Sequence, residues 1–177
     1  DGNGTWAEAE ERLLTAIRAG AAFADLEIEA PKEMGKKIRR YCSEYGTTMI
    51  RSCHFFDGVP KKYVLDSTVA SCRQFGGEIV KIAAMAASEE EARSLMELYS
   101  SEKDGRLVAF AMGEFGKSSR IDCLRLGSPF TYAALTPEEA SAPGQMDYAE
   151  MTNVVYGDFS PLDSGNILKI NASKSFA

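Results

Sequence analysis

The stretch Gly77-Glu78-Ile79-Val80-Lys81-Ile82-Ala83-Ala84-Met85 is an apolar run interrupted by a single lysine near its centre. A run of this length, between turn-forming and charged residues, is typical of a central parallel strand covered on both faces. Burying a lysine in such a strand is unfavourable by several kcal/mol unless the ammonium is paired or loses its proton. The stretch therefore predicts a buried strand in which Lys81 has a special environment.

Two interpretations of Lys81 follow from its burial. A lysine that loses its proton becomes an amine nucleophile, which is how lysines form Schiff bases with carbonyl compounds. Alternatively, Lys81 lies near a strand end and extends to water, or it pairs with a carboxylate such as Glu27. The strand by itself favours the second interpretation.

Helical and strand patterns alternate along the chain, with strands expected to begin near residues 23, 47, 78, 107 and 129. This alternation is typical of βα units and a parallel sheet. No glycine-rich phosphate loop follows the first strand, which disfavours a nucleotide-binding sheet. We therefore predict a (β/α) barrel, here a partial barrel of about five βα units over residues 1–156, with a tail or linker over 157–177. Five strands do not close an eight-stranded barrel, so three units would have to come from upstream or the sheet would keep open edges.

Composition excludes several classes of partner. The net charge is −6 and no basic block is present, which argues against nucleic acid or an anionic membrane as the main partner. No apolar run reaches the length of a transmembrane helix, and the N-terminus has no signal-peptide pattern. The four cysteines lack a CxxC spacing, which favours reduced cytoplasmic thiols over disulfides or a metal site. The first residue is Asp1 rather than Met, which suggests a fragment or a processed product.

Polar residues at the carboxyl ends of barrel strands are the candidates for function. His54 follows the second strand and could take and give a proton, although a lone histidine is usually structural. Arg120 could hold a carboxylate through a bidentate contact, or be an ordinary surface charge. Ser141 and Gln145 flank a Pro-Gly turn and could contact a polar substrate, although most such turns are only turns.

Several motifs together resemble type I 3-dehydroquinate dehydratase over residues 1 to about 156. The motifs are Asp25-Leu26-Glu27, Glu78-Ile79-Val80-Lys81-Ile82-Ala83, Met112-Gly113-Glu114, Ser119-Arg120, Gly127-Ser128-Pro129-Phe130-Thr131-Tyr132-Ala133 and Ser141-Ala142-Pro143-Gly144-Gln145. Their order and spacing also agree with that family. The lysine strand combined with the downstream SAPGQ loop is the most specific part of the resemblance.

The resemblance implies a (β/α)8 TIM barrel and a hydro-lyase of the shikimate pathway that converts 3-dehydroquinate into 3-dehydroshikimate. It implies that Lys81 forms the Schiff base and that His54 is the general acid and base. It further implies that Arg120, Ser141 and Gln145 bind the substrate, with Met112 packed beside it. No metal or organic cofactor is implied. A homodimer and a longer or fused polypeptide, for example with shikimate dehydrogenase, are further expectations, as is a cytoplasmic location.

The sequence departs from the family in two places. The family usually has His-Asp-Phe where this chain has His54-Phe55-Phe56, and the first three strands of the barrel are missing. Asp1 could stand in for a glutamate that orients the histidine in the family. These departures favour one other interpretation, a non-catalytic relative that binds a quinate-like ligand. Another Schiff-base barrel such as an aldolase is a further alternative, against which the SAPGQ loop and the position of His54 argue.

Overall fold

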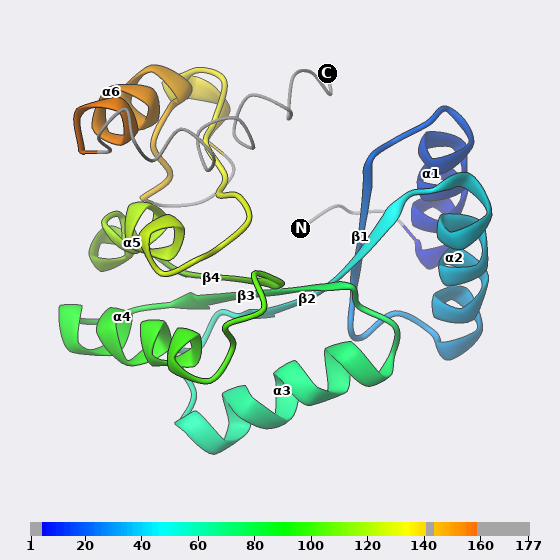
Figure 1. The fold of residues 1–177 in the computed structure, drawn as a ribbon, viewed down its shortest axis with the longest axis horizontal. Coiled ribbons are helices and arrows are strands. Elements are labelled where there is room, and N and C mark those ends of the chain that lie inside the picture. Colours follow the sequence, from blue (N-terminus) through cyan, green and yellow to red (C-terminus); the bar gives the residue numbers. More distant parts are fainter. Residues whose placement is uncertain (1–4, 141–143, 159–177) are drawn as a thin grey trace. The chain divides into compact units, whose positions relative to one another are not determined.

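The computed structural model describes residues 5–140 and 144–158, and the parallel α/β class predicted from the sequence is confirmed (Figure 1). The elements, in chain order, are α1 (Trp6–Arg18), β1 (Phe23–Glu27), α2 (Lys32–Tyr45), β2 (Thr48–Phe55), α3 (Lys62–Gln74), β3 (Ile79–Met85), α4 (Glu89–Met96), η1 (Glu97–Ser100), β4 (Leu107–Met112), η2 (Glu114–Gly116), α5 (Ser119–Arg125), η3 (Pro137–Glu139) and α6 (Tyr148–Asp158). The sheet has the strand order β1-β2-β3-β4. In the described part of the chain, no helix is long and apolar enough to cross a membrane.

The chain divides into two compact units. The first unit comprises Asp1–Cys53 and Asp66–Lys81, and the second comprises His54–Leu65 and Ile82–Ala177. In the first unit, β1 and β2 pair in parallel, with Asp25 opposite Ile50 in the register. Because parallel strands need a long crossover connection, the intervening helix α2 is part of this βαβ arrangement.

A capping box starts the first helix. The hydroxyl of Thr5 accepts a hydrogen bond from the backbone N–H of Glu8, and the Glu8 carboxylate accepts one from the backbone N–H of Thr5. These two bonds satisfy donors that the first turn of a helix otherwise leaves without partners. The same carboxylate is close to the Thr5 hydroxyl, and these hydrogen bonds lower the pKa of Glu8.

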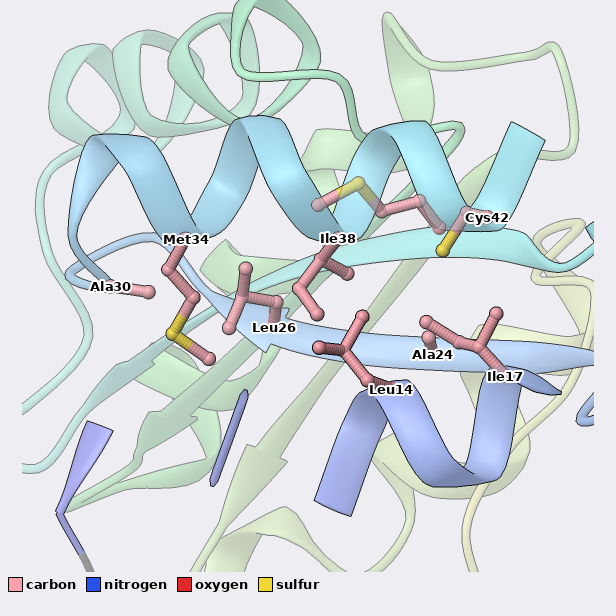
Figure 2. Close-up of a cluster of buried hydrophobic side chains, with 9 residues drawn as sticks. Leu14, Ile17, Ala24, Leu26, Ala30, Met34, Ile38 and Cys42 are labelled. Carbon is pink, nitrogen blue, oxygen red and sulfur yellow. The ribbon is translucent and has the colours of Figure 1, made fainter. Parts of the chain in front are cut away.

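The core of the first unit lies between β1 and the helices α1 and α2 (Figure 2). Leu14 and Ile17 of α1 meet the β1 side chains Ala24 and Leu26, and α2 contributes a stripe of buried residues at helical spacing. That stripe is Met34, Ile38 and Cys42. Since side chains alternate along a strand, Phe23, Asp25 and Glu27 lie on the opposite face of β1.

In the second unit, β4 is apolar throughout and every one of its six residues is buried. Side-chain hydroxyls form hydrogen bonds with the backbone groups of Ala109 and Ala111 in this strand. The Tyr99 hydroxyl accepts a hydrogen bond from the N–H of Ala109 at 2.7 Å and donates one to its carbonyl at 3.1 Å. The Ser119 hydroxyl accepts one from the N–H of Ala111 at 2.8 Å. An edge strand whose donors are already satisfied offers little for another strand to pair with.

The expectation of a fifth strand over residues 130–134 was wrong. Residues 130–133 carry no ladder, and Ala134 forms only an isolated parallel bridge with Asp147. The Ser128 hydroxyl donates a hydrogen bond to the Phe130 carbonyl at 2.6 Å, so a local contact takes a group that a strand would use. Together with the hydroxyl-capped edge of β4, this contact explains why the β-rich sequence does not extend the sheet.

Removing the Ser119 hydroxyl is expected to destabilise the second unit. In a Ser119→Ala variant, the buried N–H of Ala111 would lose its partner, which should lower the free energy of unfolding by about 1–3 kcal/mol. Urea unfolding followed by circular dichroism measures the loss. The exposed neighbour Ser118 provides the control, because its side chain caps no backbone group at this helix start. Equal stability of the two variants would contradict the capping role.

The four cysteines are free thiols, and all of them are buried. Burial raises the pKa of each thiol, to about 12 for Cys53 and to about 11 for Cys42, Cys72 and Cys123. A thiol with a raised pKa in the folded protein stays neutral at a pH where the unfolded chain releases its proton. The contribution of these thiols to folding stability is therefore constant below about pH 8 and declines as the pH rises from about 9 to about 11, or to about 12 for Cys53.

We expect each buried thiol to lower the free energy of unfolding by up to about 1.4 kcal/mol per pH unit in that window. Urea unfolding at pH 7.5, 9 and 10 measures the slope. A Cys53→Ala variant should have a shallower slope than the parent chain, because tyrosine and lysine titration is common to both. An identical slope would show that the thiol of Cys53 ionises as easily in the folded state as in the unfolded one.

Candidate active site residues

Lys81 is the third residue of β3, and its ammonium lies beside a carboxylate of the same unit. The Nζ atom donates a hydrogen bond to Oδ2 of Asp25 at 3.0 Å. The Lys81 side chain is only 13% exposed, whereas that of Asp25 is 32% exposed. The other carboxylate oxygen of Asp25, Oδ1, is buried without a hydrogen-bond partner among the described residues. An enclosed lysine is therefore present, as the apolar strand predicted.

The ion pair bears on both interpretations of Lys81. Pairing with an acid was the structural alternative, and Asp25, two residues before the expected Glu27, provides that acid. The sequence offered a signal for it, because Asp25 and Glu27 alternate on one face of β1. A proton has to leave Nζ before this amine can attack a carbonyl group, and Asp25 is an acceptor within hydrogen-bond distance.

His54 belongs to the second unit and is the last residue but one of β2. Its ring is partly buried and stacks on the ring of Phe56, with 6.1 Å between the centroids and an interplanar angle of 17°. Phe56 itself is largely exposed. The imidazole is therefore partly accessible and lies within the end of β2, whereas the sequence predicted it just after the strand.

Arg120 is the second residue of α5, and its side chain is 2% exposed. Burial lowers the pKa of its guanidinium to about 10, against a smaller opposing effect of Cys123. The guanidinium carbon lies 4.4 Å from the centroid of the Phe110 ring, and Nε has no hydrogen-bond partner in the described part of the chain. The surface-charge alternative for Arg120 is therefore wrong, because the group is enclosed.

Gly144, next to Gln145, approaches the chain just after Met112, at the carboxyl end of β4. Met112 is buried, and Gly113 follows it with a φ of +86°. Gly144 lies so close that a Cβ added to it would be 2.2 Å from the Gly113 carbonyl oxygen. This approach of the two backbones needs glycine at position 144, where φ is +75°. It brings the partly buried Gln145 to the end of the strand that carries Met112.

Two predicted positions lie outside the described residues: Ser141, expected to bind substrate, and Asp1, expected to replace a glutamate. Within the described ranges, no group of three or more His, Cys, Asp or Glu residues is arranged to hold a metal ion. The second unit thus brings together Met112 and Gln145 near one strand end, and the first unit pairs Lys81 with Asp25.

The fold is of the parallel α/β class, with lysine, histidine and arginine side chains on or after the strands of its sheet, which is where proteins of this class place functional groups. A family model described as Type I 3-dehydroquinase matches residues 3–160. The chain therefore belongs to the type I 3-dehydroquinase family, as the motifs indicated.

Curated relatives agree with this assignment. The chain is 34% identical over 142 residues to a 3-dehydroquinate dehydratase of Syntrophobacter fumaroxidans, an alignment that covers 78% of this chain and 59% of that protein. It is 35% identical over 148 residues to a 3-dehydroquinate dehydratase of Dehalococcoides mccartyi, an alignment that covers 82% of this chain and 65% of that protein. The chain thus spans about three fifths of the length of these relatives.

Solved structures agree as well. The 3-dehydroquinate dehydratase of Aquifex aeolicus superposes with a TM-score of 0.77 at 27% identity, covering 89% of this chain and 69% of that one. A structure from S. pombe contains dehydroquinate dehydratase and shikimate dehydrogenase. It superposes with a TM-score of 0.71 at 26% identity, and the match covers 90% of this chain and 30% of that one. A partial barrel is therefore the fold class, with four strands in the described residues instead of five.

Proposed function

We propose that this chain carries the Schiff-base lysine and the acid–base histidine of a type I 3-dehydroquinate dehydratase. The reaction removes water from 3-dehydroquinate and gives 3-dehydroshikimate. The observation that carries the proposal is the enclosed amine of Lys81, 13% exposed and hydrogen-bonded to Asp25. It lies within the segment that matches the family.

In the first step, Nζ of Lys81 attacks the ketone carbon of the substrate after giving up a proton, for which Asp25 is an acceptor at 3.0 Å. Loss of water from the carbinolamine then gives a protonated imine. This group withdraws electrons from the neighbouring carbon, so the C–H bond there becomes acidic enough for an imidazole to break. Lys81 thereby supplies the electron sink of the reaction.

In the following steps, His54 removes the proton from that carbon and an enamine forms. The enamine expels the substrate hydroxyl, which leaves as water with a proton returned by His54. Hydrolysis of the remaining imine releases 3-dehydroshikimate and restores the amine of Lys81. One imidazole can serve as base and then as acid because the ring nitrogen that accepts the proton can return it in the later step.

Substrate binding is proposed for four residues of the chain. Arg120 would hold the carboxylate of the substrate through its guanidinium, and Ser141 and Gln145 would contact the hydroxyls. Met112 would pack against the ring. Support comes from the enclosed position of Arg120 and from the approach of Gly144 to Gly113, which brings Gln145 to the end of β4.

The decisive experiment is to incubate the chain with 3-dehydroquinate and sodium borohydride and to measure the intact mass. Formation of 3-dehydroshikimate is followed separately by absorbance, without borohydride. A reduced adduct mapped to Lys81, together with product, supports the proposal. Absence of an adduct at saturating substrate overturns the lysine mechanism.

A non-catalytic relative is the second candidate. It is favoured by one observation, that Phe55 follows His54 where the family usually has an aspartate. Such a protein would bind a quinate-like ligand and form an adduct without releasing product. Another Schiff-base barrel lyase would instead give product from an aldol substrate and none from 3-dehydroquinate.

The proposal includes a cytoplasmic location, supported by four thiols that are all free. Association into a homodimer stays a prediction, which sedimentation velocity would measure. A longer or fused polypeptide also stays a prediction, and the S. pombe neighbour is an example of a fusion to shikimate dehydrogenase.

A further inference from the structure

Arg120 has an unusual environment for a cation. Its guanidinium is buried in the second unit, and Nε has no acceptor among the described residues. The guanidinium faces an aromatic ring, because its central carbon lies 4.4 Å from the centroid of the Phe110 ring. A cation this close to a desolvated ring is attracted by the negative potential of the ring face.

The ring of Phe110 is itself held in place. Phe110 is 4% exposed, and its ring is tilted by 54° against that of Tyr132, with 5.9 Å between the centroids. Phe130 meets Tyr132 edge-on at 5.7 Å and 78°. Aromatic pairs in these geometries are attractive, so Tyr132, itself packed on Phe130, helps to hold the Phe110 ring that faces the guanidinium.

The backbone around Arg120 is equally fixed. Ser119 joins the start of α5 to β4 through its hydrogen bonds to Ala111 and to the Gly116 carbonyl. Gly116 permits this approach, since a Cβ there would be 2.3 Å from the carbonyl oxygen of Ala111. Because Phe110 and Met112 alternate with Ala111 along β4, the guanidinium over Phe110 lies on the same face of the strand as Met112.

We propose that Phe110 is a positioning residue for ligand binding: its ring fixes the plane of the Arg120 guanidinium so that the unused Nε edge is directed at the carboxylate of the substrate. This inference rests on the proposed function, in which Arg120 binds that carboxylate. Arginine recognises carboxylates through a planar pair of N–H donors, and pre-orienting that plane removes part of the ordering that binding otherwise requires.

A fluorination series at Phe110 tests the role with almost no change of shape. Replacing Phe110 by mono-, di- and trifluorinated phenylalanine weakens the negative face of the ring in steps. We expect the dissociation constant for quinate, measured by calorimetry on the full chain, to rise in steps to about tenfold or more. In turnover, KM for 3-dehydroquinate should rise while kcat stays within about twofold.

Two controls separate positioning from packing. The same series at Phe115, an exposed ring on η2, should leave quinate binding unchanged. Binding of quinamide, which lacks the negative charge, should not respond to fluorination at Phe110. The positioning role would be overturned if the dissociation constant for quinate stayed constant or fell along the series. It would also be overturned if the dissociation constant for quinamide rose by the same factor.

A readout that does not depend on activity completes the test. The Nε–H resonance of Arg120, assigned by its loss in Arg120→Lys, should be shifted upfield by the ring in the parent chain and return to an ordinary position in Phe110→Leu. An unshifted resonance in the parent would overturn the contact itself.

If the parent shows the shift but neither binds quinate nor forms product, the proposed function fails and the role of Phe110 in it fails as well. If the parent is active and fluorination of Phe110 leaves the dissociation constant for quinate unchanged, only the inference about Phe110 fails.

Discussion

Replacing Lys81 by alanine is expected to abolish both the borohydride adduct and the formation of 3-dehydroshikimate. The reason is chemical, because the substitution removes the nitrogen that forms the imine and no other group replaces an imine as an electron sink. Intact mass spectrometry after incubation with 3-dehydroquinate and borohydride measures the adduct. Turnover that survives in the Lys81→Ala variant would disprove the Schiff-base mechanism.

Loss of activity in this variant must be separated from loss of structure. Alanine leaves the Asp25 carboxylate without the ammonium now 3.0 Å away. Because 32% of the Asp25 side chain is exposed, the destabilisation should be below the about 3–5 kcal/mol typical of a fully buried pair. Lys81→Arg is the matched control, since it keeps a cation near Asp25 but cannot form the imine. The double variant Lys81→Ala/Asp25→Asn removes both charges and should recover part of the lost stability without recovering activity.

Replacing His54 by alanine is expected to leave imine formation intact and to slow turnover by about 10²–10⁴-fold. The lysine still reacts with the ketone, whereas proton removal and hydroxyl departure lose their positioned acid and base. The borohydride adduct at Lys81 should therefore be as abundant as in the parent chain, while the rate of product formation falls. Steady-state absorbance without borohydride and intact mass after borohydride treatment give the two measurements on separate aliquots of one preparation.

A chemical rescue shows whether the effect of His54 is catalytic. Because the His54 ring stacks on Phe56, its removal also changes local packing. Added imidazole should restore part of the activity of His54→Ala if the lost group moves protons, and it should have no effect if the loss is structural. His54→Phe keeps an aromatic ring against Phe56 but should be as slow as the alanine variant. Turnover within a few-fold of the parent in either variant would remove His54 from the mechanism.

The candidate site was predictable to the extent that its signals are local. Lys81 stood out because one ammonium interrupts an apolar strand, and the structure confirms that it is enclosed. His54 and Arg120 were found from their places relative to strands. No signal of comparable strength pointed to Phe110, since an aromatic residue in an apolar strand is ordinarily part of the core.

The fifth strand shows where local reasoning failed. Residues 130–134 have a β-rich composition, but the outer backbone groups of β4 are already bonded to Tyr99 and Ser119. Strand formation depends on a partner edge as well as on the residues of the strand itself. The number of strands could therefore not be obtained from the segment alone.

By itself, the sequence determined the features that depend on neighbours a few residues away: the alternation of helices and strands, the capping box at Thr5 and Glu8, and the burial of Lys81. Hydrogen bonds within one helical turn and the twofold alternation of a strand are enough to specify these. Only the tertiary structure decided that Lys81 pairs with Asp25, 56 residues away, that hydroxyls close the edge of β4, and that Arg120 rests on Phe110. Those contacts join segments distant along the chain, and their partners are selected by packing and by the need of buried polar groups for a hydrogen bond or a favourable charge contact.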